Sequence, residues 1–340
     1  MSVHDDQRSA TEIIEALIAN RAVGIELRER VDALANISRR PSMRDGSDRQ
    51  AIGLATSFRR IESFHHPFYD DVFYGVRERA CASGYDILYF TMPGWQWENT
   101  APYVELCERY GLVGIVGLAF SFDEPGLVEL LAAEFPCVAV DLQLLGRRAS
   151  YVTSDNVSGS LMAVEHLYEI GRRRIAFIGG TEDAMTGPER RLGYVSALEK
   201  LGLEGSESLI RNAGWDILAA CEQTKVLMAQ NPAPDAIFCA SDVMAIGALS
   251  TLEAIGASVP DDVAVVGFDD IDLARLVTPS LTTIHQDKVG LGAAAIEVMT
   301  RILERPDSPP PASVLPVELT IRDSTSGAPE GDAALGKPTI

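Results

Sequence analysis

Residues 235–270 read DAIFCASDVMAIGALSTLEAIGASVPDDVAVVGFDD, and this stretch decides the fold class. Two short apolar runs, 236–239 and 263–266, have the length and side chains of buried strands. The residues between them, 242–255, have the pattern and length of a helix. Strands and helices that alternate with short connections are typical of a parallel sheet covered by helices on both faces.

The same alternation extends through most of the chain. The first set of elements consists of expected strands at 51–55, 85–90, 113–118 and 137–140 and expected helices at 70–83, 101–110 and 126–134. The second set consists of expected helices at 157–170, 188–201, 216–230 and 242–255 and expected strands at 175–178, 209–210, 236–239 and 263–266. A helix at 288–304 and one strand at 314–322 are expected to close the fold. The sequence therefore predicts an α/β fold of two tandem doubly wound parallel-sheet subdomains, with the ligand site in the cleft between them.

The expected domain boundaries follow from these elements. The N-terminal subdomain comprises about 51–153 and 287–313, and the C-terminal subdomain about 154–285 and 314–323. Residues 1–50 form a short helical segment and a polar linker, and residues 326–340, rich in Gly, Ala and Pro, are expected to be disordered.

The charge balance restricts the class of protein. The chain has 340 residues and a formal net charge of −20. This charge excludes a protein that coats nucleic acid by bulk attraction, but it leaves room for a small DNA-binding head. No apolar run is long enough to span a membrane, and the first ten residues lack the features of a signal peptide. We therefore expect a cytoplasmic protein without membrane contact.

Motifs of catalysis and metal binding are missing from the sequence. The five cysteines are scattered, and the histidines lack the spacing of a metal-binding helix face. Gly179 and Gly180 match neither a dinucleotide fingerprint nor a P-loop, and their expected role is to let a strand turn. We predict no metal, no cofactor and no enzymatic activity.

Acidic residues recur where predicted strands end. Asp141 and Asp269 follow two of these strands, and Asp242 follows a third, where we expect it to cap a helix. Carboxylates pair well with vicinal hydroxyls, and Trp215 could stack on the apolar face of a sugar. Either Arg190 or Arg191 could complete the polar set.

Longer motifs resemble those of a known family. The segments are VPDDVAVVGFDD at 259–270, TPSLTTIHQ at 278–286, SDN at 154–156, FIGG at 177–180 and ASD at 240–242. In order and spacing they are similar to the signature of the LacI/GalR transcriptional regulators, and the resemblance covers roughly residues 50–325.

The resemblance implies a periplasmic-binding-protein-like effector domain of type I. It also implies a homodimer and a small effector, commonly a sugar or a nucleobase, in the cleft. Carried over by motif, the effector-binding residues are Phe68, Tyr69, Asp141, Arg190, Trp215, Ser241 and Asp269. The family pattern favours Ser241 over Asp242 as the contact, and Gln286 is a weaker candidate.

The N-terminus departs from the family pattern. Family members begin with a helix-turn-helix head that has an Ala-Gly-Val-Ser turn and a Thr-Val-Ser recognition helix, and neither is present here. Residues 1–50 carry 8 basic and 9 acidic residues, without the local basic excess that phosphate contacts need. Two hypotheses therefore remain: a ligand-responsive regulator that binds operator DNA through a diverged head, or a sensor module of the same fold that does not bind DNA.

Overall fold

The computed structural model describes residues 49–56, 66–90, 103–122, 124, 126–182, 185–203 and 205–326. The expected N-terminal helices and most of the linker lie outside the described residues, and so does the tail beyond Ser326. No helix in the described ranges is long and apolar enough to cross a membrane.

The first sheet has six strands, all parallel, in the order β11-β5-β4-β3-β1-β2. The strands are β1 (Ala51–Thr56), β2 (Asp86–Phe90), β3 (Leu112–Leu118), β4 (Cys137–Val140), β5 (Ala149–Ser154) and β11 (Ser313–Leu315). Four helices belong to this sheet: α3 (Pro67–Ala82), α4 (Tyr103–Tyr110), α5 (Leu127–Ala132) and α10 (Lys288–Glu304). Val138 and Val140 of β4 join the core under α3 and α10, whereas Cys137 and Ala139 join the core under α4 and α5. This alternation shows that helices cover both faces of the sheet.

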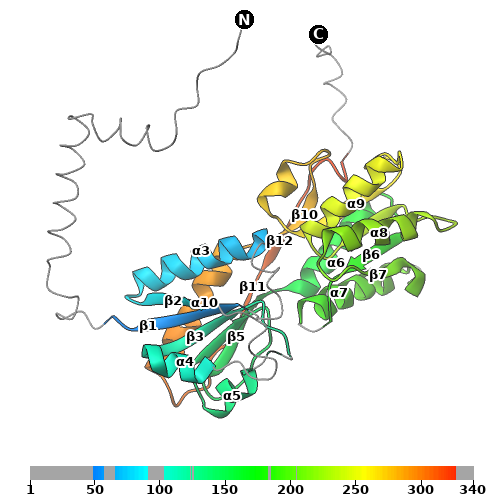
Figure 1. Ribbon diagram of the computed structural model, residues 1–340. Helices are drawn as coiled ribbons and strands as arrows, with labels where there is room; N and C mark the ends of the chain where they lie inside the picture. Colours follow the sequence, from blue (N-terminus) through cyan, green and yellow to red (C-terminus); the bar gives the residue numbers. More distant parts are fainter. Residues whose placement is uncertain are drawn as a thin grey trace, which may run out of the picture. The chain divides into compact units, whose positions relative to one another are not determined.

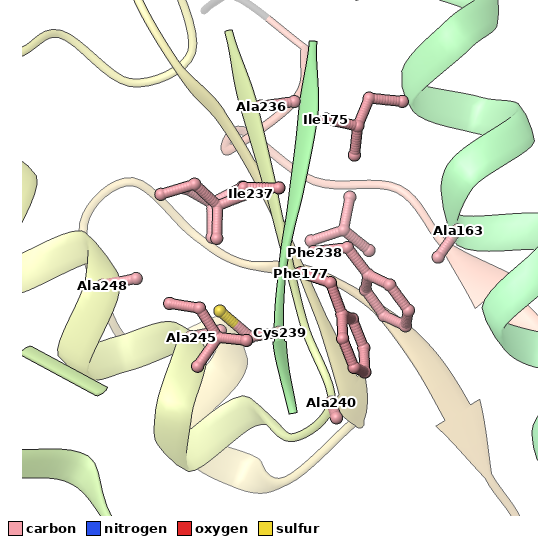
Figure 2. Close-up of a cluster of buried hydrophobic side chains, with 14 of the residues drawn as sticks. Ala163, Ile175, Phe177, Ala236, Ile237, Phe238, Cys239, Ala240, Ala245 and Ala248 are labelled. Atoms are coloured by element: carbon pink, nitrogen blue, oxygen red, sulfur yellow. The ribbon is translucent and has the colours of Figure 1, made fainter. Parts of the chain in front are cut away.

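The second sheet also has six strands, in the order β12-β10-β9-β8-β6-β7. They are β6 (Ile175–Gly179), β7 (Ile210–Asn212), β8 (Ala236–Cys239), β9 (Ala264–Asp269), β10 (Thr282–Gln286) and β12 (Val317–Thr320). Only β12, at the edge of this sheet, runs antiparallel to its neighbour. The helices of this sheet are α6 (Asn156–Glu169), α7 (Thr186–Leu201), α8 (Ile217–Met228) and α9 (Asp242–Ala254). Figure 2 shows Phe177 and Phe238 on the side of the sheet facing Ala163, with Ile237 and Cys239 on the side of Ala245 and Ala248.

Three segments of the chain cross from one sheet to the other, as Figure 1 shows. They are residues 154–156, between β5 and α6; residues 286–288, between β10 and α10; and residues 315–317, between β11 and β12. We call them the crossing segments. The prediction of one continuous strand at 314–322 is wrong, because β11 and β12 belong to different sheets with Pro316 between them. Proline has no N–H to donate to a strand ladder.

The predicted fold class of two doubly wound parallel-sheet subdomains is confirmed. Two strands were not expected, β5 and β10, whose sequences ASYVTS and TTIHQ mix polar and apolar residues. Both strands lead directly into a crossing segment, where polar side chains form hydrogen bonds instead of entering an apolar core.

Helices α3 and α10 lie side by side on the first sheet (Figure 1) and touch through their backbones. A Cβ atom on Gly292 of α10 would lie 2.0 Å from the carbonyl oxygen of Val72, and one on Gly75 of α3 would lie 2.0 Å from that of Val289. These positions require glycine because neither backbone leaves room for a methyl group.

Gly292→Ala should therefore lower the free energy of unfolding by about 1–3 kcal/mol, since the two helices must separate. The matched control is Gly205→Ala, whose new Cβ would meet only Leu198 Cδ1, at 3.8 Å. Chemical denaturation of the two variants checks this prediction, and a Gly292→Ala variant as stable as Gly205→Ala would contradict it.

Candidate functional site

A cavity lies between the two sheets, at the carboxyl ends of strands from both of them. It contains about 590 Å³ of empty space, part of which is open to solvent. The lining residues are His66, Phe68, Tyr69, Ala119, Phe120, Asp141, Thr186, Arg190, Trp215 and Asp269. The first six come from the lobe of the first sheet and the last four from the lobe of the second. This is the place where doubly wound folds bind ligands.

Arg190 of α7 and Asp269 at the end of β9 form a buried ion pair in the cavity. Arg190 Nη1 lies 3.2 Å from Asp269 Oδ1, and each residue is 3% exposed. The same Nη1 donates to the carbonyl oxygen of Ala240 at 2.5 Å, and the guanidinium lies 3.8 Å from the ring centre of Phe268. Burial raises the pKa of Asp269, and the Arg190 charge opposes this rise. No described residue hydrogen-bonds to Arg190 Nη2 or Asp269 Oδ2, so one donor group and one acceptor of this pair remain for a ligand.

Asp141, directly after β4, supplies a second carboxylate. Its backbone has a φ of 62°, and its Oδ1 accepts a hydrogen bond from Thr153 Oγ1 at 2.9 Å. Burial raises the pKa of Asp141 to about 6, although Arg190 and the Thr153 hydroxyl lower it. Within the described part of the chain, Asp141 Oδ2 has no hydrogen-bond partner. The cavity thus offers two free carboxylate oxygens from opposite lobes.

Asn156, in a crossing segment, joins these groups. Its Oδ1 accepts from Arg190 Nε at 2.9 Å, and its Nδ2 donates to Glu189 Oε2 at 2.9 Å. Gln143 of the other lobe donates to Glu189 Oε1 at 3.1 Å. The polar side chains of the two lobes therefore form one hydrogen-bonded network around the cavity.

Aromatic rings form the apolar part of the walls. Trp215 has a φ of 70° and donates from Nε1 to Thr181 Oγ1 at 2.9 Å. A Cβ on Gly180 would lie 2.0 Å from the indole, so the absence of a side chain at this position makes room for Trp215. The sequence predicted a role for Gly180 in the strand turn and not this contact. On the other lobe, the Phe68 and Tyr69 rings pack edge to face, with centroids 5.0 Å apart.

Six of the seven predicted site residues line the cavity: Phe68, Tyr69, Asp141, Arg190, Trp215 and Asp269. Ser241 is not among the lining residues, because its Oγ caps α9 by accepting from the Met244 N–H at 3.3 Å. Gln286 does not line the cavity either, but its Nε2 donates to Asp269 Oδ1 at 2.7 Å.

The prediction that Asp242 caps the helix is wrong. Asp242 is fully buried, its Oδ2 accepts from the Ile271 N–H at 2.9 Å, and its Oδ1 accepts from Thr283 Oγ1 at 2.5 Å. It therefore holds β10 and the turn after β9 in place. Sequence reasoning also missed four lining residues: His66, Ala119, Phe120 and Thr186. Two of these have a signal in the sequence, since His66 lies two residues before the predicted pair Phe68-Tyr69 and Thr186 is one helical turn before Arg190.

Among the residues that the structure describes, no group of His, Cys, Asp and Glu side chains could hold a metal ion. The arrangement of the cavity suits noncovalent binding of a small polar molecule with an apolar face.

Comparisons with known proteins show which family the chain resembles. A family model described as a periplasmic binding protein-like domain matches residues 164–325. The regulator CelR of Thermobifida fusca is 31% identical, over 80% of this chain and 80% of its own length. The chain also resembles the solved structure of a CelR–cellobiose complex, with a TM-score of 0.72 and 30% identity over 82% of this chain and 86% of that one. The repressor PurR of Histophilus somni is 26% identical, over 93% of this chain and 95% of its own length.

These matches define a class of protein in which a two-lobed, periplasmic-binding-protein-like domain is part of a transcriptional regulator. The chain belongs to the LacI family of transcriptional regulators. The family consists of regulators rather than enzymes, which confirms the prediction that the chain is not an enzyme.

The raised pKa of Asp141 predicts how the free energy of unfolding depends on pH. The folded protein holds a proton on Asp141 more tightly than the unfolded chain, so this proton stabilises the fold below pH 3.8, and the stabilisation is lost as the pH rises through about 6. Asp141→Asn keeps an acceptor for Thr153 and removes the titration. The gain in free energy of unfolding over the parent should be about 1–1.5 kcal/mol larger at pH 8 than at pH 5. Urea denaturation of both proteins at the two pH values measures this difference, and a gain that does not change with pH would contradict the prediction.

Proposed function

We propose that the chain is a ligand-responsive transcriptional regulator that binds operator DNA, and that a small neutral polyhydroxylated molecule, a sugar, is its effector. The observation that carries the effector proposal is the Arg190–Asp269 pair, which keeps a free donor and a free acceptor in a cavity with aromatic walls. A hydroxyl both donates and accepts, so two vicinal hydroxyls can bind such a pair at the same time.

The other groups of the cavity fit the same ligand. Asp141 offers a second acceptor from the opposite lobe, and Trp215 offers a flat apolar surface. The two carboxylates outnumber the one guanidinium, which disfavours an anionic ligand. The solved complex of the relative CelR contains cellobiose, which makes this disaccharide the first probe.

A nucleobase is the second candidate ligand. Trp215, Phe68 and Tyr69 can stack on any flat ring, and PurR is among the relatives. A thermal-shift screen of sugars and nucleobases separates the two classes, because a ligand that binds only the native state raises the unfolding temperature.

Asp269→Asn should weaken saccharide binding by about 10- to 100-fold, because a charged acceptor of a buried hydroxyl contributes roughly 1.5–3 kcal/mol. The amide keeps the size of the side chain, so the fold should persist. Titration calorimetry with cellobiose, or with the best sugar from the screen, measures the change.

The control for this experiment is Asp261→Asn on an exposed loop, which should bind as the parent does. If Asp269→Asn and Asp261→Asn bound the sugar with equal affinity, the assignment of the site would be wrong.

DNA binding would reside in the N-terminal residues. The match to the Histophilus somni repressor covers 93% of this 340-residue chain, which leaves about 24 residues unmatched, so the match extends into the first 48 residues. This extension favours a diverged head over the sensor module. The linker residues 42–50 contain Gly46, two aspartates and two arginines. Glycine and aspartate disfavour a helix interior, and the aspartate carboxylates would face phosphates. We therefore propose DNA binding by a homodimer that is weaker and more salt-sensitive than the fold alone suggests.

Deletion of residues 1–48 should abolish sequence-specific DNA binding and leave saccharide binding unchanged. Selection from genomic fragments followed by fluorescence anisotropy at several salt concentrations measures the first effect, and calorimetry measures the second. Specific binding that survives the deletion would refute the role of the head, and a full chain that selects no fragment, with or without ligand, would establish the sensor module instead.

Sedimentation at micromolar concentration should give a dimer.

A further inference from the structure

Each charged group of the cavity is bonded to a residue in or beside a crossing segment. Asp141 accepts from Thr153, Arg190 donates to Asn156, and Asp269 accepts from Gln286. The same segments connect the two lobes, so the positions of the charged groups depend on the local geometry of the crossing segments. One further side chain of this region, Lys288, has no part in the proposed ligand contacts.

Lys288 is the first residue of α10, and it is only 6% exposed although it carries an ammonium group. Its Nζ donates to the carbonyl oxygen of Asp269 at 2.9 Å and to that of Asp270 at 2.8 Å. Both acceptors belong to non-glycine residues with positive φ, 119° and 54°. A backbone in this region is costly for such residues and persists only where surrounding contacts hold it. The two hydrogen bonds of Lys288 provide such contacts.

The same ammonium group also lies near α3 of its own lobe. Its Nζ lies 3.8 Å from Asp71 Oδ2 on α3. The next residue, Val289, touches Gly75 of α3 backbone to backbone, so the start of α10 is fixed relative to α3. The first turn of α3 contains Phe68 and Tyr69, which line the cavity on the lobe opposite Asp269.

We propose that Lys288 is a positioning residue: it fixes the Asp269–Asp270 turn relative to α3 and so sets the distance between the Asp269 wall and the Phe68–Tyr69 wall of the cavity. The inference rests on the proposed effector site. Lys288 does not line the cavity, and it acts through the backbone of Asp269.

The first test needs no ligand. Hydrogen–deuterium exchange is measured on the full chain as the parent, Lys288→Met and the control Lys225→Met, which removes an exposed lysine from α8. Methionine keeps most of the length of the side chain and removes the donors. Peptides that contain residues 268–272 should exchange about tenfold faster in Lys288→Met, and α8 should be unchanged, because charged hydrogen bonds of this kind hold the turn locally. Equal exchange at 268–272 in the parent and Lys288→Met would overturn the proposal.

A milder variant keeps the test valid if Lys288→Met does not fold. Lys288→Arg retains a cation whose N–H groups can donate to both carbonyls. Its exchange at 268–272 should stay within about threefold of the parent. Exchange in Lys288→Arg that is tenfold or more above that of the parent would show that the donated hydrogen bonds are not what holds the turn, and it would overturn the proposal.

The second test is a double-mutant cycle with cellobiose as the probe. Lys288→Met should weaken binding about tenfold in the parent but less than about twofold in the Asp269→Asn background, because the two residues act in one chain of contacts. Equal factors in both backgrounds would overturn the proposal, since Lys288 would then act independently of Asp269. If the parent itself did not bind cellobiose, the proposed saccharide effector would lose support, whereas the exchange experiment would still decide the role of Lys288.

Discussion

The burial of Arg190 is the constraint around which the cleft is organised. A guanidinium cannot lose its proton, so once it is removed from water every part of it needs an acceptor, a counter-charge or an aromatic face. Asn156 in a crossing segment, Ala240 after β8, and Phe268 and Asp269 at the end of β9 meet this need. The remaining donor group, Nη2, has no partner among the described residues. The bonds that this buried cation needs therefore bring the residues of the site together, and one of its nitrogens, Nη2, remains available at the cavity.

The same network explains how binding could reach the rest of the molecule. The carboxylates and the guanidinium are bonded to residues in or beside the segments that cross between the lobes, and Lys288 starts the helix that packs backbone to backbone against α3. A ligand that draws Asp141 and Asp269 toward shared hydroxyls would therefore act on the crossing segments. The backbone contacts at Gly75 and Gly292 hold α3 and α10 against each other beside these segments.

Much of the fold could be predicted because the chain obeys simple patterns. Apolar runs such as 236–239 are buried on both faces of a parallel sheet, so they stand out against amphipathic helices. β5 and β10 could not be recognised in this way, because their polar residues Thr153 and Gln286 are bonded to the site and not buried for hydrophobicity. The break at Pro316 has a local signal, but the fact that its two sides join different sheets depends on tertiary contacts.

The site could be predicted from the sequence where its residues lie at the ends of recognisable strands. Asp141 and Asp269 follow strands and line the cavity, as that rule expects. The rule could not distinguish Asp242 from Ser241: both follow β8, and only the three-dimensional structure shows that the serine caps α9 while the aspartate binds the turn at Ile271. Lys288 gave no signal, since an isolated lysine at a helix start is usually exposed and its partners here are backbone carbonyls distant in sequence.

A crystal structure of the full chain grown with the best saccharide from the thermal-shift screen would test the central claim most directly. The account predicts that the sugar lies between the two sheets, with hydroxyl groups within hydrogen-bonding distance of Arg190 Nη2, Asp269 Oδ2 and Asp141 Oδ2 and one face against Trp215. A sugar bound elsewhere, with the Arg190–Asp269 pair untouched, would contradict it.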